Sequence, residues 1–329
     1  MISAKLLASV ALVTLITANI SLAVSLAAEP AAEHTANAQI GFTADTAYPE
    51  SVTWSARQGK FFVSSVRHGT VGTVTPDGTY TPFIADDKLV STVGLLVDDE
   101  RNTLWVTNSD PGAGDRTNAA TQGKLAGIAT YDATTGKRLA YYDLGRLGEG
   151  SHFANDVALD ADGNAYVTDS FAPVIYRISK AGEASIFARS PLFRDSEGFN
   201  LNGIAYHKDG YLLVGKYNSG DLFRVNIVDP ARIDRVKLPQ PLKGADGFSL
   251  ADAEHLVVVV NLGVDKTVEL VSTDGWASAK IGRETKSVTS MPTAATRAGK
   301  DVWVLNSRLD TLFDAKADKV SDFLLQKFR

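Results

Sequence analysis

Short apolar runs of four to six residues, separated by polar turns, fill the chain from Glu50 onward. The runs are rich in valine, leucine, phenylalanine and tyrosine, and the turns contain pairs such as Asp77-Gly78 and Asp209-Gly210. Runs of this length and composition, bounded by such turns, are typical of β-strands. No long stretch has the periodicity of an amphipathic helix. The pattern therefore predicts an all-β protein.

The strand pattern repeats. NDVALDADGNAYVTDS (155–170) recurs in altered form as NGIAYHKDGYLLVGKY (202–217) and DGFSLADAEHLVVVVN (246–261), and an earlier relative is ESVTWSARQGKFFVSS (50–65). Six units with a period of about 45 residues are typical of propeller blades with four strands each. The units begin near Glu50, Val93, Asn155, Asn202, Asp246 and Pro292. We predict one six-bladed β-propeller over residues 38–329, in which a strand within 38–44 completes the last blade and closes the ring.

The N-terminus has the pattern of an export signal. Lys5 precedes an apolar stretch from Leu6 to Ile20, and small residues follow it. We interpret residues 1–27 as a signal peptide and residues 28–37 as a linker, and we expect a periplasmic or secreted protein. The alternative is an uncleaved membrane anchor, but polar residues interrupt the run. We expect no stable membrane insertion after cleavage.

Composition excludes several classes of protein. The net charge of −5 and the lack of any basic run argue against nucleic acid and anionic membranes as partners. The absence of cysteine excludes disulfides, thiolate nucleophiles and cysteine-ligated metals. No Gly-x-Ser-x-Gly or nucleotide-binding glycine pattern is present, which argues against a serine hydrolase or a nucleotide cofactor. We expect a monomer that acts on a small molecule.

Four units open on a residue that could bind a metal: Glu50, Asn155, Asn202 and Asp246. If these residues begin the innermost strands of their blades, they converge on the propeller axis. Two carboxylates and two carboxamides offer only oxygen, which is the ligand set of a hard divalent cation such as Ca²⁺. The alternative is that each residue only caps a turn before its strand.

With these four residues, the chain resembles the senescence-marker-protein/gluconolactonase family of regucalcin-like, six-bladed propeller hydrolases. The resemblance covers about residues 45–310 and rests on NDVALD at Asn155, NGIA at Asn202 and DGF at Asp246. It implies that Glu50, Asn155, Asn202 and Asp246 surround a catalytic calcium or another divalent ion, and that Asp246 also acts as general base. The Gly-Pro usual after the first glutamate is replaced here by Ser51-Val52.

The resulting expectation is an exported, metal-dependent hydrolase of lactones or small esters. His152, three residues before Asn155, is a second candidate for the base. The insertion 108–128 could cover the site, so Arg116 and Asn118 are expected to contact substrate together with Asn155. Two alternatives remain open: a non-catalytic binding propeller with a structural metal ion, and a strictosidine-synthase-like enzyme, which would lack the full metal set.

Overall fold

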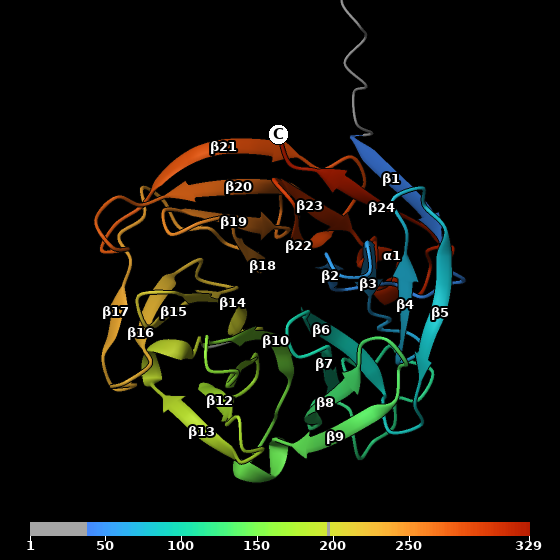
Figure 1. Cartoon of the computed structure of the whole chain (residues 1–329), viewed down its shortest axis with the longest axis horizontal. Coiled ribbons are helices and arrows are strands. Elements are labelled where there is room, and N and C mark those ends of the chain that lie inside the picture. Colours follow the sequence, from blue (N-terminus) through green and yellow to red (C-terminus); the bar gives the residue numbers. More distant parts are fainter. Residues whose placement is uncertain (1–37, 196–197) are drawn as a thin grey trace, which may run out of the picture. The chain divides into compact units, whose positions relative to one another are not determined.

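The structure, a computed structural model, describes residues 38–195 and 198–329, which belong to one compact unit. The predicted signal peptide (1–27) and linker (28–37) lie outside the described residues. The prediction of an all-β, six-bladed propeller is confirmed, because six four-stranded antiparallel sheets surround a central axis (Figure 1). Within the described residues, no helix is both long and apolar enough to cross a membrane.

The strands of each sheet run from the axis outward. The innermost strands, one for each blade, are β2 (Val52–Ser55), β6 (Ser91–Asp98), β10 (Ala154–Leu159), β14 (Leu201–His207), β18 (Ala245–Leu250) and β22 (Pro292–Ala298). The second strands are β3 (Lys60–Val63), β7 (Thr103–Ser109), β11 (Ala165–Asp169), β15 (Tyr211–Lys216), β19 (His255–Val260) and β23 (Asp301–Asn306). These bounds agree with the six units predicted from the sequence.

The third strands are β4 (Thr70–Val74), β8 (Ala126–Asp132), β12 (Val174–Ile178), β16 (Leu222–Asn226), β20 (Lys266–Val271) and β24 (Asp322–Lys327). The outermost strands are β5 (Tyr80–Ala85), β9 (Arg138–Asp143), β13 (Ala184–Arg189), β17 (Ile233–Arg235), β21 (Lys280–Lys286) and β1 (Gln39–Thr43). Helical structure in the described part is limited to α1 (Leu309–Phe313) and two 3₁₀ turns, Gly145–Leu147 and Pro191–Phe193.

The hydrophobic core lies between the blades. Buried side chains form six clusters, and each cluster joins two neighbouring sheets. Between blades two and three, for example, Trp105 and Ile128 pack with Val157 and Val167. A blade alone would expose both faces of its sheet, so the ring is stable only when all six interfaces are made.

β1 closes the ring, as predicted from the sequence. It pairs antiparallel with β24, so the N-terminal strand is the outer strand of the last blade. Its buried residues Ile40 and Phe42 alternate with exposed neighbours. The ring centroid of Phe42 lies 5.8 Å from that of Phe323 in the same blade and 6.4 Å from that of Tyr80 in blade one. One strand thus contacts the sheets on both sides of the closure.

We expect Phe42→Ala to lower the free energy of unfolding by about 3–5 kcal/mol, because it removes a buried aromatic ring and leaves a cavity at the closure. Denaturant unfolding followed by tryptophan fluorescence measures this. Gln39→Ala, on the exposed face of the same strand, is the matched control and should change stability by less than about 0.5 kcal/mol. Equal midpoints for the two variants would show that β1 does not stabilise the closed ring.

Candidate metal centre

The inner strands share a local irregularity that brings one side chain from each blade to the axis. In five of the six blades, the register between the innermost strand and the second strand shifts near the start of the innermost strand. In β6 the shift lies between Thr92 and Leu95, and in β10 it lies between Ala154 and Val157. Such bulges add local twist and redirect a side chain. The residues at this position, together with Glu50 just before β2, all line one cavity of about 450 Å³: Glu50, Val93, Asn155, Asn202, Asp246 and Thr293.

Hydroxyl groups of the preceding blade hold these segments in place. Thr107 Oγ1 on β7 donates to the carbonyl of Asn155, at 2.8 Å. Thr168 Oγ1 on β11 donates to the carbonyl of Asn202, at 2.6 Å. Gly203 approaches the next blade so closely that a Cβ there would lie 2.1 Å from the carbonyl oxygen of Asp246. Each inner strand is therefore positioned by its neighbour, and the cavity depends on the complete ring.

The side chains at the axis leave oxygen atoms free. Asn155 donates its Nδ2 to Ser170 Oγ, at 3.0 Å, so its amide oxygen remains available. Asp246 Oδ2 accepts from Asn261 Nδ2, at 2.5 Å, while its Oδ1 is buried without a hydrogen-bond partner among the described residues. Asn202 Oδ1 and Thr293 Oγ1 are likewise buried without a partner in that part of the chain. Unsatisfied buried oxygens are costly unless something binds them.

Electrostatic repulsion adds to this cost. Burial, followed by the negative charges of Asp246 and Asp156, holds the pKa of Glu50 well above its usual range. Burial is also the main reason why the pKa of Asp246 rises to about 7; the hydrogen bond from Asn261 opposes this rise. Carboxylates that repel one another in a poorly hydrated site are stabilised by a cation.

The residues present therefore fit a hard divalent cation. Carboxylate, carboxamide and hydroxyl oxygens from five blades face one cavity, and such oxygens are the ligands that Ca²⁺ prefers. No group of three or more His, Cys, Asp or Glu side chains that could hold a metal is found in the described residues. This agrees with the composition of the axial set, in which only Glu50 and Asp246 carry carboxylates.

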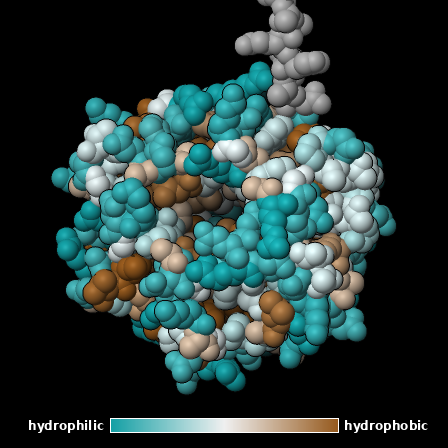
Figure 2. Space-filling view, viewed as in Figure 1, coloured by the Kyte–Doolittle hydropathy of each residue, from teal (hydrophilic) through white to brown (hydrophobic). Residues whose placement is uncertain are grey.

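The rest of the cavity is apolar. Three phenylalanines pack together on one side of it, with ring centroids 5.3 Å apart for Phe153 and Phe171 and 5.2 Å apart for Phe171 and Phe199. Leu309 and Phe313 of α1 lie at the cavity as well, and Phe313 is half-exposed. The molecular surface is largely hydrophilic but is hollowed near the centre of the face seen in Figure 2. The polar oxygens thus lie in a site that also offers apolar contact to a ligand.

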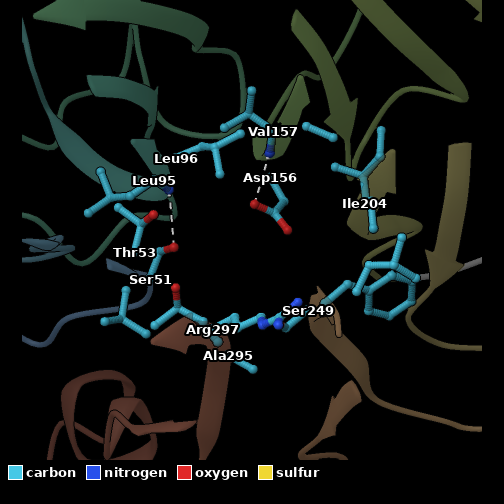
Figure 3. A pocket seen from close by; sticks show the side chains of 18 of the residues that line it. Ser51, Thr53, Leu95, Leu96, Asp156, Val157, Ile204, Ser249, Ala295 and Arg297 are labelled. Carbon is cyan, nitrogen blue, oxygen red and sulfur yellow. Dashed lines mark hydrogen bonds between the residues drawn. The ribbon is translucent and has the colours of Figure 1, made fainter. Parts of the chain in front are cut away.

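A second cavity, of about 330 Å³, lies along the axis among the inner strands of all six blades. Asp156 points into it, and its Oδ1 accepts the backbone N–H of Val157 (Figure 3). Asp156 occupies the place taken by Gly94, Gly203 and Gly247 in their blades. Burial raises the pKa of Asp156 to about 7. Its charge raises the pKa values of Glu50 and Asp246, so the axis carries a third carboxylate.

His152, the second candidate for the base, lies elsewhere. It lines a separate cavity on blade three and is not among the residues that line the axial cavity. The reason is local: Phe153, the next residue, is directed to the axial cavity, while the imidazole of His152 is held by Asp169. A direct role in chemistry at Asp246 is therefore not supported by its position.

The insertion between β7 and β8 folds on itself. Asp110 accepts hydrogen bonds from the hydroxyls of Thr117 and Thr121, both at 2.7 Å. Arg116 donates to the carbonyls of Asp86 and Leu89, and Asn118 bonds within the loop. Neither Arg116 nor Asn118 lines the axial cavity, and the insertion contributes only Pro111 to it. The substrate contacts predicted for these two residues therefore lack a geometric basis.

Sequence reasoning missed Thr293, Asp156 and the aromatic wall. Thr293 could have been found from the register of the sixth unit, since it follows Pro292 as Asn155 follows Ala154. Asp156 follows a predicted ligand directly, but the pattern of the unit does not distinguish it from the other residues of its strand. Phe171 and Phe199 belong to loops whose path the repeat pattern does not define.

Comparison with known proteins supports the architecture. No protein-family model and no curated protein matches the sequence. Among solved structures, the allergen Mala s 1 of Malassezia sympodialis is similar over 88% of this chain and 96% of its own, with a TM-score of 0.71 and 18% identity. A luciferin-regenerating enzyme is similar over 88% and 95%, with a TM-score of 0.58 and 13% identity. Virginiamycin B lyase of Staphylococcus aureus is similar over 88% and 99%, with a TM-score of 0.56 and 14% identity. At identities of 13–18%, the likeness shows only that this chain shares its fold with these proteins.

Proposed function

We propose that this protein is an exported, divalent-metal-dependent hydrolase of lactones or small esters, with Ca²⁺ as the expected ion. The observation that carries the proposal is the set of free oxygens at the axis: Asn202 Oδ1, Asp246 Oδ1 and Thr293 Oγ1 are buried and unsatisfied beside Glu50 and Asn155. The occurrence of enzymes among proteins of the same fold supports an enzymatic role.

Glu50, Asn155, Asn202 and Asp246 would hold the cation. A cation bound there would polarise the carbonyl of a lactone or ester and favour the negative charge that develops on its oxygen. Asp246 would accept a proton from water. In the metal-free site its pKa is about 7, and a nearby positive charge lowers this value, so the carboxylate is ionised at neutral pH.

Other side chains of the site position this machinery. Asn261 Nδ2 holds Asp246 Oδ2 and is itself fixed by the hydroxyl of Tyr217, which donates to Asn261 Oδ1 at 2.7 Å. The other carboxylate oxygen of Asp246 is thereby directed away from Asn261. Phe153 and Phe199 supply an apolar surface for the alkyl part of a substrate and exclude bulk water. The cavity of about 450 Å³ suits a small molecule, and we expect a monomer to suffice.

Metal removal tests the proposal. The purified protein is stripped with a chelator and assayed on a panel of lactones and aryl esters, with and without added calcium. We expect turnover to fall by at least about a hundredfold without metal and to return with calcium, because the loss of charge stabilisation costs several kcal/mol. A protein that binds calcium and gains stability from it, yet is inert on the whole panel, would instead be a binding propeller with a structural ion.

A further inference from the structure

A cavity of about 370 Å³ on blade three has features that the proposed hydrolase does not use. It lies between the loop 148–151 and the strand ends of that blade, and its walls include His152, Tyr176, Arg189 and Arg194. Phe171 lines both this cavity and the axial one. The two spaces are therefore neighbours with an aromatic ring between them.

The imidazole of His152 is held in one orientation. Its Nδ1 faces Asp169 Oδ2 at 2.9 Å, and the hydroxyl of Tyr176 donates to the same oxygen at 2.8 Å. Asp169 Oδ1 accepts three backbone N–H groups, those of Phe153, Phe171 and Ala172, at 2.8–2.9 Å. Asp169 is buried and acts as an acceptor toward all of these groups, so Nδ1 is the ring nitrogen that donates to it. The opposite nitrogen, Nε2, is directed away from Asp169.

That nitrogen is buried without a partner. His152 is only 4% exposed, and its Nε2 has no hydrogen-bond partner among the described residues. The hydrogen bond to Asp169 raises the pKa of His152; the charge of Asp169 and a smaller contribution from the backbone of Gly148 add to this rise, while burial and Arg189 oppose it. The imidazole therefore presents an unused N–H donor to the cavity when it is protonated.

The guanidinium of Arg189 lies near the Nε2 side of His152. A Cβ built on Gly148 would lie 3.4 Å from His152 Nε2 and 4.0 Å from Arg189 Nη2, so both nitrogens border one small space beside a glycine. Neither Arg189 nor Arg194 forms an ion pair or a side-chain hydrogen bond within the described residues. Glu149 is the only acidic residue of the described lining, which contains two arginines. The two arginines thus leave a net positive charge.

We propose that this cavity binds a small oxyanion, a carboxylate or a phosphate, between His152 Nε2 and Arg189, with Arg194 at its rim. A planar guanidinium and an imidazolium are suitable donors for the oxygens of such a group. The missing side chain at Gly148 leaves the space that an oxygen atom would occupy. The site lies outside the axial oxygen set, so its occupation does not require a bound cation.

The test follows the imidazole nitrogens of ¹⁵N-labelled protein by NMR while inorganic phosphate, and separately acetate, is added at constant pH and ionic strength. We expect the Nε2 signal of His152 to move and to saturate with at least one of the two anions, and the anion that gives saturation identifies the ligand class. Gly148→Ala keeps every charge but fills the space with a methyl group, and Arg189→Gln removes one charge-assisted donor. Each variant should weaken binding by about tenfold or more.

Two controls separate this site from the proposed hydrolase. Arg57→Gln, an exposed arginine on blade one, should leave the anion titration unchanged. Asp246→Asn alters the axial set and should also leave it unchanged. A His152 signal that does not respond to either anion, drifts without saturation, or responds equally in the Arg189→Gln and Arg57→Gln proteins would overturn the proposal. None of these results depends on whether the axial site hydrolyses esters.

Discussion

Asp246→Asn is expected to abolish turnover on any lactone or ester substrate, with kcat lowered by at least about a thousandfold. The substitution keeps the shape of the side chain and an oxygen that can accept from Asn261, but it removes one of the two axial ligand carboxylates and the proposed base. The loss of a general base alone typically costs 10²–10⁴-fold. Weaker binding of the cation adds to this, because Glu50 would then be the only carboxylate among the proposed ligands.

The rate assays should be accompanied by a calcium titration by calorimetry, which measures affinity for the ion, and by a thermal melt, which shows whether the variant is folded. Asp162→Asn changes an exposed turn carboxylate that lines neither axial cavity and serves as the matched control, with activity and calcium affinity expected to stay at the level of the unsubstituted protein. Full activity in Asp246→Asn would refute the role of Asp246. An inactive variant that still binds calcium as tightly would assign Asp246 to proton transfer and not to the hold on the ion.

The metal-free protein is expected to become more stable as the pH falls from 8 to 5. The folded-state pKa of Asp246, about 7, lies above the value of about 3.9 in an unfolded chain, so the folded protein binds a proton more tightly. Stability from this group is present below the unfolded pKa and is lost as the pH rises through about 7. Glu50, whose pKa is raised as well, adds to the effect. The total change is on the order of 2–4 kcal/mol.

Calcium should weaken this dependence on pH, because a cation binds the ionised carboxylates. At pH 8, an ion concentration a hundredfold above Kd would stabilise the protein by about 2.7 kcal/mol, and the gain should be smaller at pH 5. Denaturant unfolding at both pH values, with and without calcium, measures the pH dependence of the metal-free protein and the stabilisation by calcium. Asp156→Asn removes a charge that raises both pKa values and should flatten the metal-free profile. A metal-free protein that loses stability between pH 8 and pH 5 would contradict this account.

Repetition made most of the fold predictable from the sequence. A blade is specified by apolar runs and turns that lie within about 45 residues of one another, and the same specification occurs six times. The strand around Phe42 could be assigned to the last blade because a closed ring leaves no free edge, and its pairing with β24 bears this out. The local strand pattern and the requirement for a closed ring were together sufficient to predict the fold.

The candidate site was only partly predictable. Equivalent positions in a repeat converge by symmetry, so the convergence of Glu50, Asn155, Asn202 and Asp246 followed once the blades were aligned. The metal, the substrate and the reaction stay predictions. His152 shows that closeness in sequence does not ensure closeness in space. It lies only three residues before Asn155, yet its side chain lines a different cavity.

The sequence by itself determined the number of blades, the closing strand and four of the residues that stand at the axis, because these depend on a short-range pattern and its repetition. Only the tertiary structure decided the chemical surroundings of those residues. The unsatisfied oxygens of Asn202 and Asp246, the third carboxylate of Asp156 and the aromatic wall beside Phe171 arise where chain segments from different blades meet. Burial and charge repulsion depend on all of these neighbours at once, and no single stretch of sequence contains them.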